Sequence, residues 1–376
     1  MIARGVVLFF IAVLVAGCAA KGYEPSAIPS FKKTVDINRV WHASMGAASQ
    51  AFAEISILES IACATADHKI LCVDPLDGSS IFEKDFDSLE LSGVTLNRSG
   101  LFLTTRVGKV LSLDMTGSVR WENDVREEIL GRPTSVRDLL LVRTISGAIY
   151  SYSQEDGSLR WKFFPERRRL VLRETASPVE SSDGNIFVGF PGGALSKIDV
   201  STGEIIWNGM VAIPSGDNEI ERLTDVVGTP LVLDGRVCVA AYQGRVGCFN
   251  QSTGVILWSV PVSAIGSLAT NGSDLYITTS DGELLCVDGS TGVEKWRQTS
   301  LRYRGLTSPS FVSGLLLVGD YDGNIFALDS ADGRLVGVAN GGGGRITSSP
   351  LVAGDKVVTL TSSGSLSVFS LVDRDI

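Results

Sequence analysis

The side chains that could perform chemistry are few in this sequence. Histidine occurs only at His42 and His68, and neither stands in a pattern that suggests a Ser-His-Asp arrangement. The stretch 320–324, Asp-Tyr-Asp-Gly-Asn, is similar to a calcium-binding loop because carboxylate and amide side chains alternate along it. It lies where other parts of the chain have a hairpin turn with Gly, and such a turn explains the same residues without a metal. We therefore predict neither a catalytic centre nor a metal site.

The cysteines offer a second kind of chemistry. Beyond one in the N-terminal segment the chain holds five, and no Cys-x-x-Cys spacing occurs, so the residues do not predict a zinc site. Two pairs flank expected hairpin turns: Cys63 with Cys72, and Cys238 with Cys248. Cross-strand disulfides are one interpretation. We favour the other, in which the cysteines are small buried apolar residues, because Cys72, Cys248 and Cys286 fall at one position of a repeat.

The N-terminal segment carries a motif for covalent modification. One positive charge precedes an apolar run over 5–16, which has the length of the hydrophobic region of a signal peptide. The residues Val-Ala-Gly-Cys18 follow and are similar to the bacterial lipobox, in which the cysteine receives lipid and becomes the first residue of the mature protein. We expect a signal peptide over 1–17 and a lipid anchor at Cys18, on the periplasmic face of the outer membrane, which Ala19 permits. An ordinary signal peptide or a short membrane anchor is the alternative.

The rest of the chain consists of a repeated sequence pattern. A β-branched strand, a turn with Gly, a second strand and a Trp recur with a period of about 40 residues. The Trp-type positions are Trp41, Phe82, Trp121, Trp161, Trp207, Trp258, Trp296 and, in degenerate form, the region near Val336. This period and turn chemistry are typical of a β-propeller, in which each repeat forms a blade of four short strands.

The two ends of the chain divide one repeat between them. Residues 38–41 supply only an outermost strand, whereas 345–370 supply three strands and no Trp. We therefore predict an all-β fold, an eight-bladed β-propeller of four-stranded antiparallel blades over 36–376. The N-terminal strand would close the ring by pairing with the C-terminal blade, and residues 18–35 would form a tether. Seven blades are the alternative, because the repeats near Phe82 and Val336 are weak.

Composition and turn phrases bear on the class of function. The formal net charge is −9 and the longest basic run is Arg167–Arg169, so we do not expect nucleic acid as a partner. Phrases such as A-L-D-x-x-T-G-x-x-x-W are shared with the quinoprotein alcohol and glucose dehydrogenases, which makes an enzyme of that class an alternative. That resemblance would also imply a calcium site and, in larger members, adjacent cysteines. Because no Cys-Cys pair occurs and little sequence lies outside the repeats, we expect no enzymatic activity and no cofactor.

Two consecutive repeats are longer than the others, and we name the additional residues the first and the second loop segment. The first lies within 162–178 and contains Leu-Val-Leu-Arg-Glu-Thr-Ala-Ser-Pro at 170–178. The second lies within 211–230 and contains Glu-Ile-Glu-Arg-Leu-Thr-Asp-Val-Val-Gly-Thr-Pro at 219–230. Insertions in a repeat array collect on one face, so we expect the two segments to lie side by side.

These two motifs resemble the marker loops of the BamB family, lipoproteins of the outer-membrane β-barrel assembly machinery. The family's loops read approximately L-x-L-R-G-x-S-A-P and E-I-D-R-L-x-D-V-D-x-T-P, and Val227 stands here at the second acidic position of the latter. The resemblance implies docking on a periplasmic POTRA domain of the barrel subunit BamA, through apolar anchors with a charged rim. It assigns partner binding to Leu170, Leu172, Arg173, Glu219, Arg222, Leu223 and Asp225.

The resemblance implies a non-enzymatic scaffold that assists the insertion of outer-membrane proteins together with other barrel-assembly subunits. Unfolded outer-membrane proteins could in addition pair with blade edges, a hypothesis to which no residue is assigned. Two alternatives stay open. The loop segments could only cap their blades, with Arg173 and Asp225 as a structural ion pair, or the propeller could be an adaptor for another envelope complex.

Overall fold

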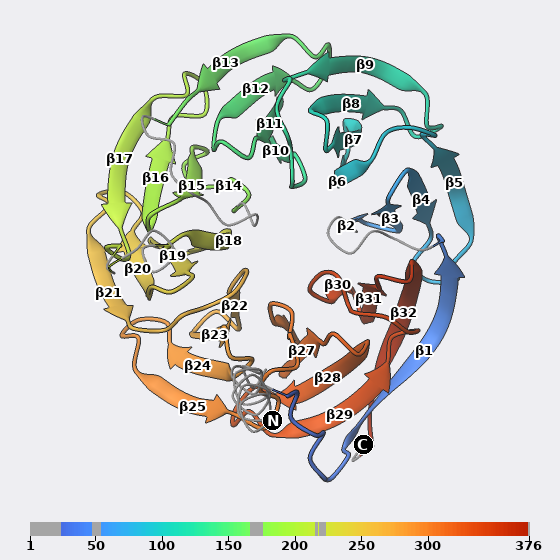
Figure 1. Cartoon of the computed structure of the whole chain (residues 1–376), viewed down its shortest axis with the longest axis vertical. Coiled ribbons are helices and arrows are strands. Elements are labelled where there is room, and N and C mark those ends of the chain that lie inside the picture. Colours follow the sequence, from blue (N-terminus) through green and yellow to red (C-terminus); the bar gives the residue numbers. More distant parts are fainter. Residues whose placement is uncertain (1–23, 47–53, 166–175, 215–216, 218–222, 375–376) are drawn as a thin grey trace, which may run out of the picture.

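The fold was analysed in a computed structural model, which describes residues 24–46, 54–165, 176–214, 217 and 223–374. The described residues contain 32 strands, arranged as eight four-stranded sheets around a ring (Figure 1). Seven of the sheets use four consecutive strands, with the first strand innermost. The predicted eight-bladed propeller is therefore confirmed, and the seven-bladed alternative is wrong. No helix long and apolar enough to cross a membrane occurs among the described residues.

The blades are numbered along the chain. Blade 1 comprises β2 (Glu54–Leu58), β3 (Ile61–Ala66), β4 (Lys69–Val73) and β5 (Ser80–Asp85). Blade 2 comprises β6 (Leu91–Asn97), β7 (Gly100–Thr105), β8 (Lys109–Leu113) and β9 (Val119–Asp124). Blade 3 comprises β10 (Thr134–Val136), β11 (Leu139–Arg143), β12 (Ile149–Ser153) and β13 (Leu159–Phe163). Blade 4 comprises β14 (Val179–Glu180), β15 (Ile186–Phe190), β16 (Ala194–Ile198) and β17 (Ile205–Met210).

The second half of the ring repeats this order. Blade 5 comprises β18 (Val226–Leu233), β19 (Arg236–Ala241), β20 (Val246–Asn250) and β21 (Ile256–Val260). Blade 6 comprises β22 (Ala269–Thr270), β23 (Asp274–Thr278), β24 (Leu284–Asp288) and β25 (Glu294–Gln298). Blade 7 comprises β26 (Ser310–Val312), β27 (Leu315–Gly319), β28 (Asn324–Asp329) and β29 (Leu335–Asn340). Blade 8 comprises β30 (Leu351–Ala353), β31 (Lys356–Leu360), β32 (Ser365–Asp373) and, from the other end of the chain, β1 (Val35–Ser44).

The two ends of the chain close the ring as predicted. β1 pairs antiparallel with β32 from Val35 opposite Asp373 to Ser44 opposite Ser365. The Arg374 guanidinium adds two hydrogen bonds to the Asp36 carboxylate, of 2.6 and 2.8 Å. Closure therefore uses a full strand ladder, which leaves blade 8 with the same four strands as its neighbours.

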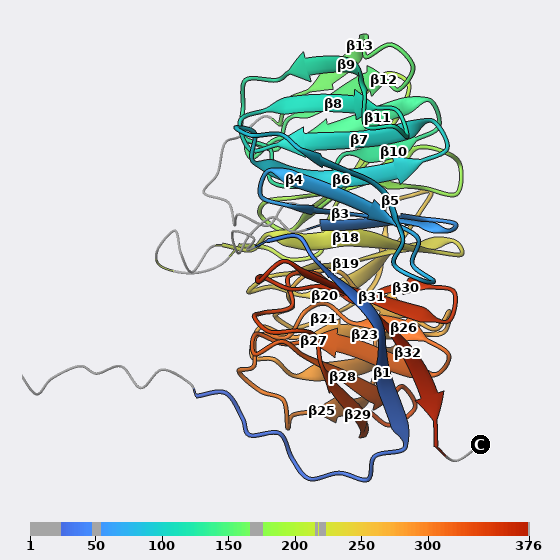
Figure 2. The same ribbon diagram turned by 90° about the vertical axis from the view of Figure 1, so that its right-hand side faces the viewer.

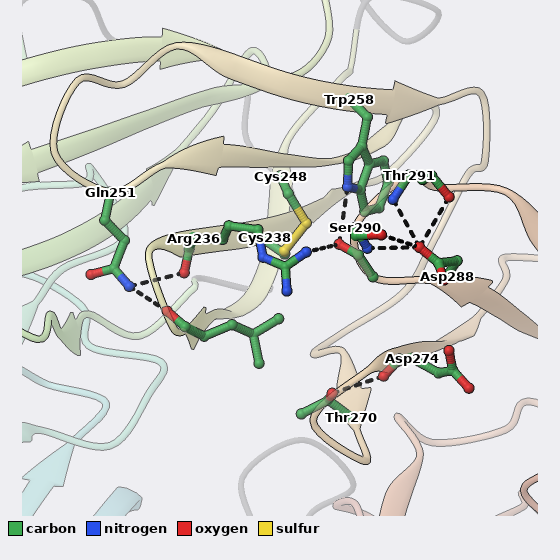
Figure 3. The surroundings of a disulfide bond; sticks show 12 residues. Arg236, Cys238, Cys248, Gln251, Trp258, Thr270, Asp274, Asp288, Ser290 and Thr291 are labelled. Carbon is green, nitrogen blue, oxygen red and sulfur yellow. Dashed lines mark hydrogen bonds between the residues drawn. A yellow bond between two sulfur atoms is a disulfide. The ribbon is translucent and has the colours of Figure 1, made fainter.

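The recurring Trp and Gly of the sequence meet between neighbouring blades. The indole of Trp258, on the outermost strand of blade 5, donates a hydrogen bond of 3.1 Å to the carbonyl of Gly289 in the last turn of blade 6 (Figure 3). Gly292 of that turn has φ of +75°, and a Cβ there would lie 2.5 Å from the Trp258 ring. Only glycine fits both the backbone conformation and the close approach. Equivalent indole bonds join the blades at Trp41, Trp121, Trp161, Trp207 and Trp296.

The degenerate position near Val336 has a physical explanation. The strand register of blade 7 sets Gly337 opposite Ala327, where other blades have the Trp. A Cβ on Gly337 would lie 2.8 Å from the carbonyl oxygen of Val35. Val35 and Ile37 of β1 pack there in an apolar cluster with Val336. The N-terminal strand thus fills the space that a Trp fills elsewhere.

The favoured interpretation of the cysteines is wrong for four of the five. The structure contains disulfides between Cys63 and Cys72, with Cα atoms 4.1 Å apart, and between Cys238 and Cys248, with Cα atoms 4.0 Å apart. In each pair the two residues face each other directly across the second and third strands of one blade. The repeat alignment considered the third strand alone, so it missed the facing cysteine. Cys286, which faces Tyr276 instead, is the buried free thiol that was predicted.

Candidate partner-binding site

Most of the predicted site residues lie outside the described residues: Cys18, Leu170, Leu172, Arg173, Glu219 and Arg222. The structure describes the remaining two, Leu223 and Asp225, and the chain on both sides of each loop segment. The geometry of these roots determines where the loop segments begin and end.

Both loop segments join the outermost strand of one blade to the innermost strand of the next. The first runs from β13 to β14 and the second from β17 to β18. Because the strands of each blade alternate in direction, all connections between blades leave the ring at one face, which we call the loop face. The turns between the second and third strands of each blade open at the same face. The two loop segments are consecutive connections on it (Figure 1).

The roots of the two loop segments share one apolar cluster. Ala176, where the first segment returns to the fold, packs in this cluster with Val211, Ala212 and Val226 from the two ends of the second. Gly189 lies between Ala176 and Val226, and a Cβ at Gly189 would collide with the Val226 side chain. The expectation that the two segments start from neighbouring places is thus confirmed for their roots. Apolar side chains on the outgoing ends are open to solvent, with Phe164 61% and Ile213 81% exposed.

Asp225 is part of the interior and does not belong to an exposed charged rim. Its side chain is only 4% exposed, and its carboxylate accepts a hydrogen bond of 3.1 Å from the amide of Gly192 in blade 4. Its carbonyl accepts the amide of Tyr242 at 2.9 Å. Leu223 is half-buried. Asp225 therefore holds the end of the second loop segment against the neighbouring blade.

A buried arginine that the sequence analysis missed supports the same place. Arg143, the last residue of β11, is 8% exposed, and its Nη1 donates to the carbonyl of Ala176. The guanidinium carbon lies 5.2 Å from the centroid of the Phe190 ring, within the range of a cation–π contact. Burial lowers the pKa of Arg143 to about 10, and the negative charge of Asp225 opposes this shift. One buried positive charge thus contacts the root of the first segment and attracts the carboxylate at the root of the second.

A sequence signal for Arg143 existed. The second strands of the other blades end in uncharged residues, for example Thr105, Phe190 and Ala241, whereas Leu-Leu-Leu-Val-Arg143 ends in a charge. An arginine at the end of an apolar strand needs a buried partner. The partner, Asp225, stands two blades further along the chain, which a single repeat does not reveal.

Val227 stands at the second acidic position of the family's loop, and the structure explains what it does here. It is 3% exposed and packs in an apolar cluster with Cys238 and Leu275. A carboxylate at this position would need a partner inside that cluster. In this chain the position serves packing between blades 5 and 6.

The calcium-like stretch at 320–324 uses its carboxylates within the protein. Asp320 is fully buried and accepts a hydrogen bond of 2.8 Å from Nε of Arg304, while Asp322 accepts one of 2.8 Å from Nη2 of the same guanidinium. Asn324 donates its backbone amide to Asp320 at 2.7 Å. These contacts stabilise the β27–β28 turn, as the hairpin interpretation expected. No group of three or more metal-ligating side chains occurs in the part of the chain that the structure describes.

Comparisons with known proteins place these features in a family. A family model described as outer membrane protein assembly factor BamB matches residues 66–298 and 289–375. An outer membrane protein assembly factor BamB of Bordetella pertussis is 30% identical over 370 residues, which cover 96% of this chain and 96% of that protein.

Two solved structures show the same fold. The crystal structure of BamB from Moraxella catarrhalis superposes with a TM-score of 0.81 at 24% identity, covering 89% of this chain and 99% of that chain. The quinohemoprotein alcohol dehydrogenase of Comamonas testosteroni superposes with a TM-score of 0.72 at 13% identity, covering 90% of this chain and 76% of that one, which shows a shared propeller and nothing more. By its matched residues and by its similarity along almost the whole length, the chain belongs to the BamB family.

Proposed function

We propose that this protein is a non-enzymatic scaffold of the machinery that assembles β-barrel proteins in the outer membrane. It docks through its two loop segments on a periplasmic POTRA domain of BamA and takes part in the complex with the other barrel-assembly subunits. The observation that carries the proposal is the similarity to an assembly factor over 96% of the chain, together with a family-model match over 66–298 that spans both loop motifs.

The architecture at the loop roots supports docking by both segments together. An apolar cluster and the Arg143–Asp225 attraction hold the two roots side by side, so residues from both segments can reach one partner surface. Interfaces of this kind concentrate their binding energy in a few apolar and arginine side chains. In this proposal Leu170, Leu172, Arg173, Glu219, Arg222 and Leu223 contact BamA. Asp225 is buried, so in this proposal it positions the second loop segment without contacting BamA.

The proposal includes an anchor in the outer membrane. Cys18 receives lipid, the signal peptide over 1–17 is removed, and the propeller faces the periplasm. The lipobox-like Val-Ala-Gly-Cys18 supports this part. Two or more acyl chains on one residue bind a membrane stably, whereas a single chain binds only marginally.

Co-purification from detergent-solubilised envelopes tests the docking. Arg173→Glu should abolish recovery of BamA. The substitution replaces a planar guanidinium, which can pair with a carboxylate of the partner, by a negative charge that repels this carboxylate. Arg98→Glu is the matched control, since Arg98 lies in the β6–β7 turn at the opposite face and its side chain is 87% exposed. Equal recovery of BamA with both variants would show that the first loop segment is not the docking site.

A further inference from the structure

The chain immediately before β1 is held against the propeller along its length. Residues 24–34 belong to no strand, yet they follow the margin of blades 6 and 7 from the loop face to β1 (dark blue in Figure 2). We call these residues the strap. Two prolines, Pro25 and Pro29, restrict its backbone and lower the entropy that is lost when it becomes ordered.

The upper end of the strap is bonded at Ser26. Its amide donates a hydrogen bond of 3.0 Å to the carbonyl of Arg302, and its carbonyl accepts one of 2.7 Å from Nη1 of Arg304. Both arginines lie in the connection between blades 6 and 7, on the loop face. Arg304 is only 6% exposed and is fixed by Asp320 and Asp322. Ser26 is thus bonded to a buried guanidinium that two carboxylates hold in place.

The middle and lower parts of the strap are also bound. Phe31 packs against the apolar cluster between blades 6 and 7 that contains Leu301, Leu306 and Phe326. The amide of Thr34 donates to the carbonyl of Val336 at 3.0 Å, and the carbonyl of Thr34 accepts the amide of Arg374 at 2.8 Å. A free linker would make none of these contacts.

We propose that the strap fixes the place where the anchored end of the chain leaves the propeller, and that a lipid surface therefore lies beside the blade 6–blade 7 margin of the loop face. This inference rests on the lipid anchor at Cys18 in the proposed function. The chain makes eight Cα–Cα steps from Cys18 to Ser26 and reaches at most about 28 Å when fully extended. Without the strap, it would make seventeen steps from Cys18 to Val35 and reach about 60 Å.

The fixed exit has a consequence for the partner surface. The exit lies at the connection between blades 6 and 7, and the loop segments lie at the connections between blades 3 and 4 and blades 4 and 5 of the same face. The strap therefore sets one edge of the loop face next to the membrane and leaves the loop segments further around the ring. A partner bound to them is held in a defined direction relative to the membrane.

Limited proteolysis of a chain that begins at residue 19 and carries no lipid tests the strap itself. Trypsin can cleave after Lys32 only when the strap leaves the propeller. Ser26→Pro together with Phe31→Ser removes the amide donor and the apolar contact, and should raise the rate of this cleavage about tenfold or more. Ile28→Ser is the matched control, because Ile28 is 40% exposed. Equal rates of cleavage after Lys32 in the unaltered protein and both variants would show that the strap is not held against the propeller.

Fluorescence quenching on vesicles tests the orientation with the lipidated protein. A fluorophore is attached at Tyr321→Cys in the β27–β28 turn of blade 7, or at Val107→Cys in the equivalent β7–β8 turn across the ring. Tyr321 is 56% and Val107 62% exposed, so both variants should fold. The native free thiol does not compete, because Cys286 is buried and burial raises its pKa to about 12.

Vesicles that carry a quencher on lipid headgroups should quench the label at position 321 several times more strongly than the label at position 107. Ser26→Pro with Phe31→Ser should remove this difference while vesicle binding persists. Equal quenching at positions 321 and 107 in the protein with an unaltered strap would contradict the proposed orientation on the membrane. A protein that binds no vesicles would overturn the anchor and the orientation together, whereas the proteolysis result would stand independently of both.

Discussion

At the scale of single residues, the candidate site depends on a pair of charges that are not on its surface. Arg143 contacts the root of the first loop segment, and Asp225 ends the second. Both are nearly fully buried, with 8% and 4% of their surface exposed. Breaking a buried charge arrangement by removing one member is strongly destabilising, because the other charge stays in a medium of low polarity. These two residues therefore position the docking segments and stabilise the fold at the same time.

Asp225→Lys should destabilise the protein by about 3–5 kcal/mol, because it sets a second positive charge near Arg143 and removes the acceptor for Gly192. Chemical denaturation followed by circular dichroism measures the loss. Ile213→Lys, at an 81% exposed position in the same loop segment, should change the free energy of unfolding by less than about 0.5 kcal/mol. A wild-type unfolding curve for Asp225→Lys would show that Asp225 is instead a surface residue available to a partner.

At the scale of the elements, the ladder register shifts in every outermost strand, as at Ile206 before Trp207 and Leu257 before Trp258. In every blade except blade 7, a Trp or Phe follows the shift and packs on a turn of the next blade. A bulge twists an edge strand and interrupts pairing with another chain. The bulges therefore interrupt the edge that each outermost strand presents to any other chain.

The contact between Trp and turn predicts different costs for two glycines of blade 5. Gly235 has φ of +66° and open space at its Cβ position, whereas Gly254 has φ of +71° and would place a Cβ 2.6 Å from the Trp207 ring. Gly235→Ala should cost about 1–2 kcal/mol from backbone strain alone. Gly254→Ala should cost about 1–3 kcal/mol more, because it also overpacks the contact. Equal losses in urea denaturation would mean that Trp207 and the turn do not pack tightly.

The same elements explain how much could be predicted from the sequence. The period of about 40 residues between successive Trp-type positions predicted eight blades, because a repeat of that length supplies four short strands. It could not reveal the Cys63–Cys72 and Cys238–Cys248 disulfides, because these depend on facing positions in two strands and not on one repeat position. The sequence could not reveal the burial of Asp225 for a similar reason, because the residues around it come from blades 3 and 4 as well as from blade 5.

At the scale of the whole molecule, ring closure and the exit of the N-terminal segment are joined through the strap. The strap reaches β1, β1 completes blade 8, and Trp41 of β1 packs on Gly78 of blade 1 and donates to the carbonyl of Pro75 at 3.0 Å. Any force on the N-terminal end of the chain therefore acts first on the contacts of Ser26 and Phe31 with blades 6 and 7, and only then on the strand that closes the ring. The strands at the roots of the loop segments, β14 and β18, lie across the ring from β1 (Figure 1).

In the proposed function, the loop segments bind a POTRA domain directly. Calorimetric titration of the purified propeller, from residue 19, with the purified periplasmic POTRA domains of BamA from the same organism measures this without other subunits. We expect saturable binding with one propeller per BamA, loss of the signal for Arg173→Glu, and unchanged binding for Arg98→Glu. Absence of binding by the unaltered, folded propeller, or full binding by Arg173→Glu, would contradict the proposed docking.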